Sequence, residues 1–297
     1  MFRTVYAVCS HIRLGRPYYV LPVVAAAVSG YFSSSGDGFC LSAAARVCVV
    51  FLLLGMSSWA ANEITDRDSD SRGRPKRRWG LYVCGGTAML SSGTISVRSA
   101  MIYVVMLGTF GLVAAVALGM LFCGLSVCFL AIGLAYSVKP LRLKQRGVIG
   151  LAAVATAYGV LAFSAGWVAG GQSPTIRSLL LGCLLSVAFF GFEGIPHLLD
   201  HDQDSVNGES TIAVALGCET TRCVLAVCQC VPALALVSTS LLKGSSVLNL
   251  GFLLLAALAF LSACIAALTA RCQEERLLGS LRVVSVPLMA AFSFLMV

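Results

Sequence analysis

The sequence predicts an all-α integral membrane protein with nine transmembrane helices in a single domain that covers residues 1–297. Hydrophobic residues make up 58% of the chain and charged residues only 11%, whereas about 25% of the residues in a soluble domain are charged. Apolar runs of roughly 20 residues, the length that crosses a bilayer as a helix, recur throughout. These runs lie at about residues 18–36, 42–61, 100–117, 120–137, 148–170, 178–199, 222–242, 247–270 and 281–297.

The distribution of positive charge predicts how these helices are oriented. The chain contains 21 Lys and Arg residues and has a net charge of +8. If the N-terminus is cytoplasmic, only Arg46, Arg177 and Lys243 fall on the far side of the membrane, as the positive-inside rule favours. We therefore expect a multi-pass protein of a bacterial inner membrane or an organelle equivalent. Its cytoplasmic loops are expected at about residues 62–98, 138–147 and 200–221.

Two groups of acidic residues lie far apart in the sequence, each at the cytoplasmic end of a predicted helix. Asn62, Asp66 and Asp70 are four residues apart, so they share one face if the preceding helix continues through them. Asp200 and Asp204 repeat this spacing after a later apolar run. Carboxylates arranged in two such groups are suited to hold a divalent metal against phosphate oxygens.

Further polar residues extend the second acidic group into the membrane. Glu193 and His197 precede Asp200 at helical spacing, about two turns and one turn deeper, and Pro196 is expected to kink this run. Ionisable groups inside a membrane helix usually face a cavity or a partner. His197 and His201 could suggest zinc, but the neighbouring carboxylates favour magnesium.

Clusters of positive charge flank the acidic groups in the predicted cytoplasmic loops. Arg74 and Lys76 follow the first group, and Lys139, Arg142 and Lys144 form a cluster without any acid among them. This combination suits a diphosphate, because a metal bridges some phosphate oxygens while Arg or Lys neutralises the others. The sequence therefore predicts the anion-binding half of the same site in these loops.

One aromatic residue next to the second cation cluster allows two interpretations. Tyr136 lies at the predicted membrane edge, where interfacial aromatic residues are common. It could equally donate a hydrogen bond to a substrate. The sequence does not decide between these two roles.

Three motifs stand in the order N-x-x-x-D-x-x-x-D, Y-S-x-x-P-x-R-x-K, and D-x-x-x-D with a trailing N-G-x-x-T and L-G. Their residues are Asn62, Asp66 and Asp70; Tyr136, Ser137, Pro140, Arg142 and Lys144; and Asp200, Asp204, Asn207, Gly208, Thr211, Leu216 and Gly217. This pattern resembles the UbiA superfamily of intramembrane prenyltransferases. The resemblance runs from about residue 18 to the end of the chain.

The resemblance implies nine helices around a central cavity that the cytoplasmic loops cap. It also implies two Mg²⁺ ions, held by the two Asp motifs, that bind a prenyl diphosphate. The expected metal ligands are Asn62, Asp66, Asp70, Asp200 and Asp204, and the expected diphosphate contacts are Asn62, Arg74, Lys76, Tyr136, Lys139, Arg142 and Lys144. Each acidic group ends the second helix of a four-helix unit, so the first eight helices are expected to form two related halves with the ninth added.

These observations predict an enzyme that ionises an allylic prenyl diphosphate and transfers the isoprenoid to an aromatic or other small lipophilic acceptor. Glu193 or His197 is expected to orient or deprotonate that acceptor. Two alternatives stay open: a terpene cyclase of the UbiA type, in which the chain's own double bond attacks the cation, and, more remotely, a membrane carrier. The expected partners are the prenyl diphosphate, the acceptor and the lipid bilayer, with no nucleic acid.

The sequence departs from the family pattern in two places. Glu63 stands where the family usually has Asp directly after the motif Asn. The family run R-P-x-R-P-x-P-S-G is divided here between residues 74–78 and 91–93. The insertion between them is expected to form a longer lid over the site.

Overall fold

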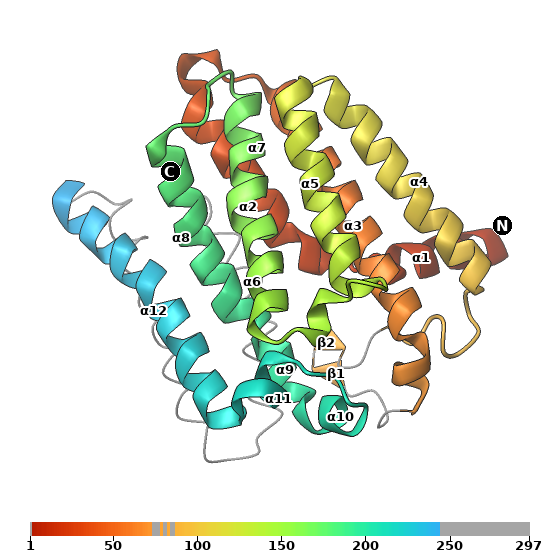
Figure 1. Ribbon diagram of the computed structural model, residues 1–297. Helices are drawn as coiled ribbons and strands as arrows, with labels where there is room; N and C mark the ends of the chain where they lie inside the picture. The colour runs from red at the N-terminus through yellow and green to blue at the C-terminus, as the bar shows by residue number, and fades with distance from the viewer. Residues whose placement is uncertain (1, 73–77, 80–81, 84–86, 244–297) are drawn as a thin grey trace.

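The computed structural model describes residues 2–72, 78–79, 82–83 and 87–243, and this part is helical apart from one short pair of strands (Figure 1). Five of the described helical segments are long and apolar enough to cross a membrane: Leu41–Asp68, Val97–Val116, Met120–Ser137, Val148–Ala169 and Ile176–Leu199. The predicted all-α membrane class is therefore confirmed for this part of the chain. The predicted runs 247–270 and 281–297 lie outside the described residues, so the count of nine stays a prediction.

The elements follow one another along the chain with short connections. The helices are α1 (Phe2–Leu14), α2 (Pro17–Ser35), α3 (Leu41–Arg72), α4 (Val97–Val116), α5 (Met120–Ser137), α6 (Val148–Thr156), α7 (Ala162–Ala169), α8 (Ile176–Glu193), α9 (Ile195–Leu199), α10 (His201–Val206), α11 (Ile212–Leu216) and α12 (Cys218–Lys243). Two 3-10 segments, η1 (Gly36–Gly38) and η2 (Leu143–Gln145), and one π-helical segment, η3 (Ala157–Leu161), complete the helical elements. The strands β1 (Arg78–Trp79) and β2 (Tyr82–Val83) pair antiparallel.

The helix that carries the first acidic group is continuous. Helix α3 runs from Leu41 to Arg72 and so passes through Asn62 and Asp66, as the spacing predicts. The predicted spans 100–117 and 120–137 are separate helices, α4 and α5. Gly119, with φ of 104°, turns the chain between them, because glycine adopts this conformation at little cost.

The helix expected to carry the second acidic group is broken twice. Helix α8 ends at Glu193, and Pro196, which has no N–H to donate, lies in the first turn of α9. A second break at Asp200 separates α9 from α10. The predicted polar stripe is thus divided among α8, α9 and α10 instead of lying on one helix. The Asp204 N–H still donates to the Asp200 carbonyl at 2.8 Å.

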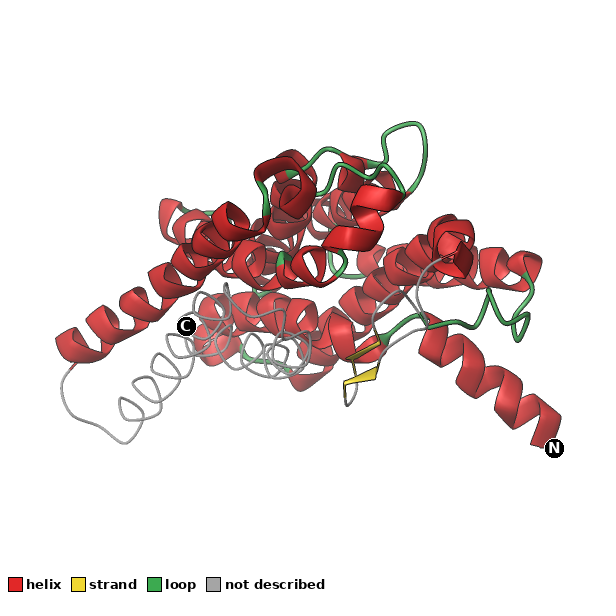
Figure 2. Ribbon diagram, turned by 90° about the horizontal axis from the view of Figure 1, so that it is seen from below, coloured by secondary structure: helices red, strands yellow, loops and turns green. Residues whose placement is uncertain are grey.

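The long helices stand side by side, and the short helices α9, α10 and α11 gather at one end (Figure 1). Helix α2 packs against α3 and α7, α3 also packs against α4 and α5, and α8 packs against α12. Helices α1 and α12 lie at opposite edges of the bundle, as the view from the end that carries α9 to α11 also shows (Figure 2).

A line of aromatic rings joins four elements inside the bundle. The ring centroids of Phe51 on α3 and Phe129 on α5 are 5.1 Å apart, and Phe129 lies 6.0 Å from Tyr158 on η3. Tyr158 in turn lies 5.5 Å from Phe189 on α8. These side chains are buried, so α3, α5, η3 and α8 share one apolar interior.

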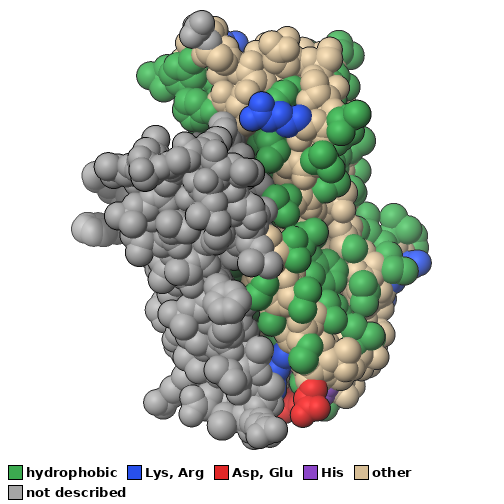
Figure 3. Space-filling view, turned by 90° about the vertical axis from the view of Figure 1, so that its left-hand side faces the viewer, with side chains coloured by type: hydrophobic (Ala, Val, Ile, Leu, Met, Phe, Trp, Pro, Cys, Tyr) green, Lys and Arg blue, Asp and Glu red, His purple; other side chains and the backbone are tan. Residues whose placement is uncertain are grey.

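The described part of one outer face carries hydrophobic side chains along its length, with Lys or Arg toward both ends and acidic and histidine side chains near one of them (Figure 3). Exposed side chains such as Val105, Phe110 and Val113 on α4 contribute to the apolar exterior of the bundle. A protein in water buries most such groups, whereas a membrane helix presents them to lipid. The surface therefore agrees with the membrane class.

A buried ion pair fixes the part of α3 that precedes the first acidic group. Glu63 is only 3% exposed and pairs with Arg16, at the start of α2. Its carboxylate also accepts hydrogen bonds from the Thr87 N–H at 2.9 and 3.0 Å and from the Thr87 hydroxyl at 2.9 Å. The Arg16 guanidinium lies over the ring of Trp59, 5.2 Å from its centroid. Glu63, the departure from the family pattern, thus joins three segments next to Asn62.

We expect Glu63→Gln to lower the free energy of unfolding by about 2 kcal/mol, because a buried guanidinium then loses its counter-charge. Thermal unfolding in detergent measures the change. Asp68→Asn on the same helix is the control, since Asp68 is exposed. Equal stability of the two variants would contradict a structural role for the ion pair.

Candidate active site

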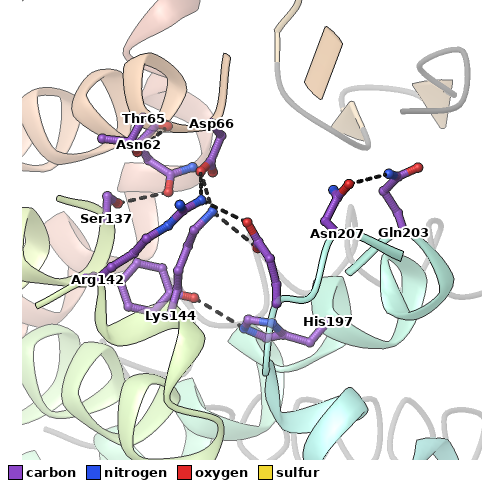
Figure 4. A network of polar contacts seen from close by, with 11 residues as sticks. Asn62, Thr65, Asp66, Ser137, Arg142, Lys144, His197, Gln203 and Asn207 are labelled. Atoms are coloured by element: carbon purple, nitrogen blue, oxygen red, sulfur yellow. Dashed lines mark hydrogen bonds and ion pairs between the residues drawn. The ribbon is translucent and has the colours of Figure 1, made fainter. Parts of the chain in front are cut away.

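The first acidic group lies at the polar end of the bundle, where α3 meets the end of α5 (Figure 4). The Ser137 hydroxyl, at the last position of α5, donates to Asn62 Oδ1 at 2.9 Å. The Thr65 hydroxyl donates to the Asn62 carbonyl oxygen at 3.0 Å. The Ser137 hydrogen bond thus orients the Asn62 side chain, one helical turn from Asp66.

Some of the predicted site residues cannot be placed. The side chain of Asp70 lies outside the described part of the chain, although its backbone belongs to α3. Arg74 and Lys76 also lie outside the described residues. Their expected roles stay predictions.

The predicted cation cluster contributes two side chains to this end of the bundle. Lys144, in η2, forms an ion pair with Asp66, and Arg142 Nη2 lies 3.4 Å from Asp66 Oδ1. Both cations are mostly buried, with side-chain exposures of 9% and 16%. Lys139 is exposed. The loop after α5 thus directs two of its predicted cations toward the first acidic group.

A second carboxylate that the sequence analysis did not single out holds the same cations. Glu209 Oε1 lies 2.8 Å from Arg142 Nη2, and Glu209 Oε2 lies 3.5 Å from Lys144 Nζ. Glu209 is itself buried, at 7% exposure. The sequence does show an acidic residue directly after Asn207 and Gly208. Its partners, Arg142 and Lys144, are far away in the sequence, so the contact could not be predicted.

The second acidic group lies beside these ion pairs. The Asp204 carbonyl accepts the Glu209 N–H at 2.8 Å, which ties α10 to the loop that carries Glu209. Burial, together with the nearby Asp200 carboxylate, raises the pKa of Asp204 to about 8. Lys144 also acts electrostatically on Asp204. Lys144 therefore pairs with Asp66 of the first group and with Glu209, whose N–H is hydrogen-bonded to Asp204 of the second group.

Tyr136 and His197 form a polar contact on the membrane side of the ion pairs. The Tyr136 hydroxyl lies 3.3 Å from His197 Nε2, and Tyr136 packs against the apolar core. Tyr136 also interacts electrostatically with the carboxylates of Glu193, Asp66 and Asp204. The Tyr136 hydroxyl therefore faces His197 of α9 inside the helix bundle, and its role toward a substrate stays a prediction.

Comparison with known protein families identifies the family of this chain. The model of the UbiA prenyltransferase family matches residues 20–278. The chain belongs to the UbiA prenyltransferase family. Its members are transferases, and the predicted resemblance is confirmed.

Solved structures of UbiA homologues share the fold of this UbiA-family chain. A homologue from Archaeoglobus fulgidus, bound to DMAPP and Mg²⁺, has 22% identity and a TM-score of 0.70, with 97% of this chain and 98% of that chain covered. The apo structure of a homologue from Aeropyrum pernix K1 has 21% identity and a TM-score of 0.69, with 94% and 97% covered.

A curated relative is the bacteriochlorophyll synthase 34 kDa chain of Chloroflexus aurantiacus. It is 31% identical over 172 residues, which cover 56% of this chain. The match spans 49% of the length of that relative.

The UbiA family implies Mg²⁺, and the donor chemistry of this site fits that ion. Asn62, Asp66, Asp200 and Asp204 offer amide and carboxylate oxygens, which Mg²⁺ prefers. Desolvation, and then the nearby Asp200 carboxylate, raise the pKa of the partly buried Asp204, and a bound cation would oppose both effects. In the described part of the chain, no three His, Cys, Asp or Glu side chains are gathered as a metal cage, and Asp66 is paired with Lys144.

Proposed function

We propose that this chain is a Mg²⁺-dependent intramembrane prenyltransferase that ionises an allylic prenyl diphosphate and transfers the isoprenoid to an aromatic or other small lipophilic acceptor. The observation that supports the proposal is the position of Lys144, paired with Asp66 and Glu209 at the polar end of an apolar bundle. A diphosphate head needs such cations, and a prenyl chain needs such an interior. UbiA homologues solved with GPP or DMAPP and Mg²⁺ support this ligand class.

The proposed roles follow the two acidic groups and the cation loop. Asn62, Asp66, Asp70, Asp200 and Asp204 are proposed as metal ligands. Arg142 and Lys144 are proposed as the principal diphosphate contacts, joined by Arg74, Lys76 and Lys139. Two ions are proposed because each acidic group can hold one.

The chemistry assigned to the chain's own residues is electrostatic. Bound Mg²⁺ supplies the positive charge that stabilises the departing diphosphate. Arg142 and Lys144 neutralise the remaining phosphate oxygens as the allylic C–O bond breaks. The aromatic core beside Tyr136 excludes water, which would otherwise capture the carbocation.

The acceptor is proposed to bind beside Glu193 and His197. His197 contacts Tyr136, and Glu193 interacts electrostatically with the same phenol. This group can therefore orient the attacking atom or accept its proton.

We expect Glu193→Gln and His197→Ala each to lower transfer to the native acceptor by about a hundredfold, the usual contribution of a general base. Binding of the prenyl diphosphate should persist, because neither residue is proposed to contact it. His201→Ala is the matched control, since His201 instead contacts the exposed Asp202. Full turnover in both variants would remove these residues from the acceptor site.

The proposed activity is tested by incubating the purified full chain with prenyl diphosphates of several lengths, with and without Mg²⁺, followed by mass analysis of the products. The acceptors should include a tetrapyrrole, because the Chloroflexus relative is a bacteriochlorophyll synthase. An arm without acceptor distinguishes transfer from cyclisation, which yields a cyclic hydrocarbon or alcohol. Failure to consume any donor in the presence of Mg²⁺ would refute the proposal.

We also propose nine spans around a central cavity, with the N-terminus and the site on the cytoplasmic side. The distribution of Lys and Arg supports this orientation. Labelling of single cysteines from either side of intact membrane vesicles tests it. A label at position 139 that reacts only from the cytoplasmic side is expected, and the opposite result would reverse the orientation.

A further inference from the structure

In the described part of the chain, Arg142 and Lys144 form a cluster of ion pairs with Asp66 and Glu209. Two cations are shared between Asp66 and Glu209, and all four side chains are at most 16% exposed. Charges buried this far from water are stable only when they are paired. If a ligand recruits one member of the cluster, the remaining members must still be neutralised.

The two carboxylates of this cluster are anchored differently. Asp66 lies one turn from Asn62 on α3, and its side chain is 14% exposed. Glu209 is more buried, at 8% for its side chain. Its N–H donates to the Asp204 carbonyl at 2.8 Å, and the Gly147 N–H donates to the carbonyl of the next residue, Ser210, at 2.8 Å. Glu209 is therefore fixed to both the cation loop and the second acidic group.

The loop that carries the cations has little regular structure of its own. Arg142 has a φ of 34°, and Lys144 belongs to a three-residue 3-10 segment. Such a segment cannot by itself hold two long side chains in one direction. The carboxylates on either side of them supply that constraint.

We infer that Glu209 is a positioning residue, the fixed counter-charge that shares Arg142 and Lys144 with Asp66 and so allows Asp66 to exchange these cations for metal. This inference rests on the proposed function, because it assumes that Asp66 is a metal ligand and that the two cations meet a diphosphate. Glu209 itself contacts neither the metal nor the substrate. Its negative charge sets how strongly the cations retain Asp66.

Loss of the Glu209 charge has opposite consequences for the two ligands. Without it, Arg142 and Lys144 retain Asp66 more tightly, and the site becomes more positive, so Mg²⁺ binds more weakly. The same excess of positive charge attracts a free diphosphate more strongly. A residue that only stabilises the fold would weaken both interactions together.

The test is isothermal titration calorimetry on the full chain in detergent, with inorganic diphosphate in the presence of EDTA and, separately, with Mg²⁺ alone. For Glu209→Gln we expect metal-free diphosphate to bind about fivefold more tightly and Mg²⁺ to bind about fivefold more weakly than in the wild type, a coupling of ordinary size. Glu219→Gln is the matched control, because Glu219 is exposed at the start of α12. It should match the wild type for both ligands.

A second variant keeps the inference testable if Glu209→Gln does not fold. Glu209→Ala removes the same charge and should shift the two affinities in the same directions, with tighter diphosphate binding and weaker Mg²⁺ binding. Changes of the same sign for both ligands, or no change in either, would overturn the inference while leaving the proposed function in place. Absence of diphosphate binding by the wild type, with or without Mg²⁺, would instead overturn the proposed function and the inference with it.

Discussion

Asp66→Asn is expected to lower turnover with any allylic prenyl diphosphate by about a thousandfold or more, which corresponds to several kcal/mol of lost stabilisation at the departing diphosphate. Asp66 belongs to the first acidic group and pairs with both Lys144 and Arg142 of the cation loop. Asparagine keeps the shape of the side chain but not its charge. The loss therefore reports metal and charge chemistry, and Asp200→Asn should show a similar loss from the second group.

The measurement is steady-state turnover of the purified variants over a range of Mg²⁺ concentrations. Asp68→Asn is the matched control, because Asp68 lies two residues away on α3 with a side chain that is 85% exposed. Thermal unfolding shows whether Asp66→Asn is folded. A folded Asp66→Asn with turnover close to that of Asp68→Asn would remove Asp66 from the metal site.

The positions of Asn62, Asp66 and Lys144 were predictable because their signals are local. A four-residue spacing places Asn62 and Asp66 on one face whenever the helix continues, and α3 does continue to Arg72. Lys144 belongs to a loop of cations without acids, which favours contact with an anion. The positive-inside rule also predicts that this loop and both acidic groups share one side of the membrane.

The roles of Glu209 and Glu63 could not be predicted, because each depends on a partner that is distant in the sequence. Arg142 is 67 residues from Glu209, and Arg16 is 47 residues from Glu63. Each carboxylate is buried only because tertiary packing brings its cation to it. Glu63 departs from the Asp of the family pattern, but no physical reason for this difference can be read from the sequence alone.

The second polar stripe shows how local signals compete. The spacing of Glu193, His197 and Asp200 suits one helix, whereas Pro196 removes a backbone donor within it. The structure breaks the helix on both sides of Pro196, at Gly194 and at Asp200. His197 still reaches Tyr136, because a single turn of α9 preserves its direction over that short distance.

Gly166→Ala is expected to lower the free energy of unfolding by about 3 kcal/mol or more, because the added methyl group has no room. A Cβ at Gly166 on α7 would lie 1.7 Å from the Ala27 carbonyl oxygen and 2.9 Å from the Tyr31 nitrogen, both on α2. Gly30 makes the reciprocal contact, since its Cβ would lie 2.1 Å from the Phe163 carbonyl oxygen. These neighbours are backbone atoms, so the helices themselves would have to separate.

This close approach matters because small residues let membrane helices gain packing contacts that lipid does not provide. Gly124→Ala on α5 is the matched control, since nothing lies within 4 Å of a Cβ at that position. It removes a helical glycine without a clash, so stability should stay the same or rise slightly. Thermal unfolding and the yield of monodisperse protein in one detergent compare the two. Equal stability of Gly166→Ala and Gly124→Ala would mean that α2 and α7 do not approach through Gly30 and Gly166, and that other contacts hold the bundle together.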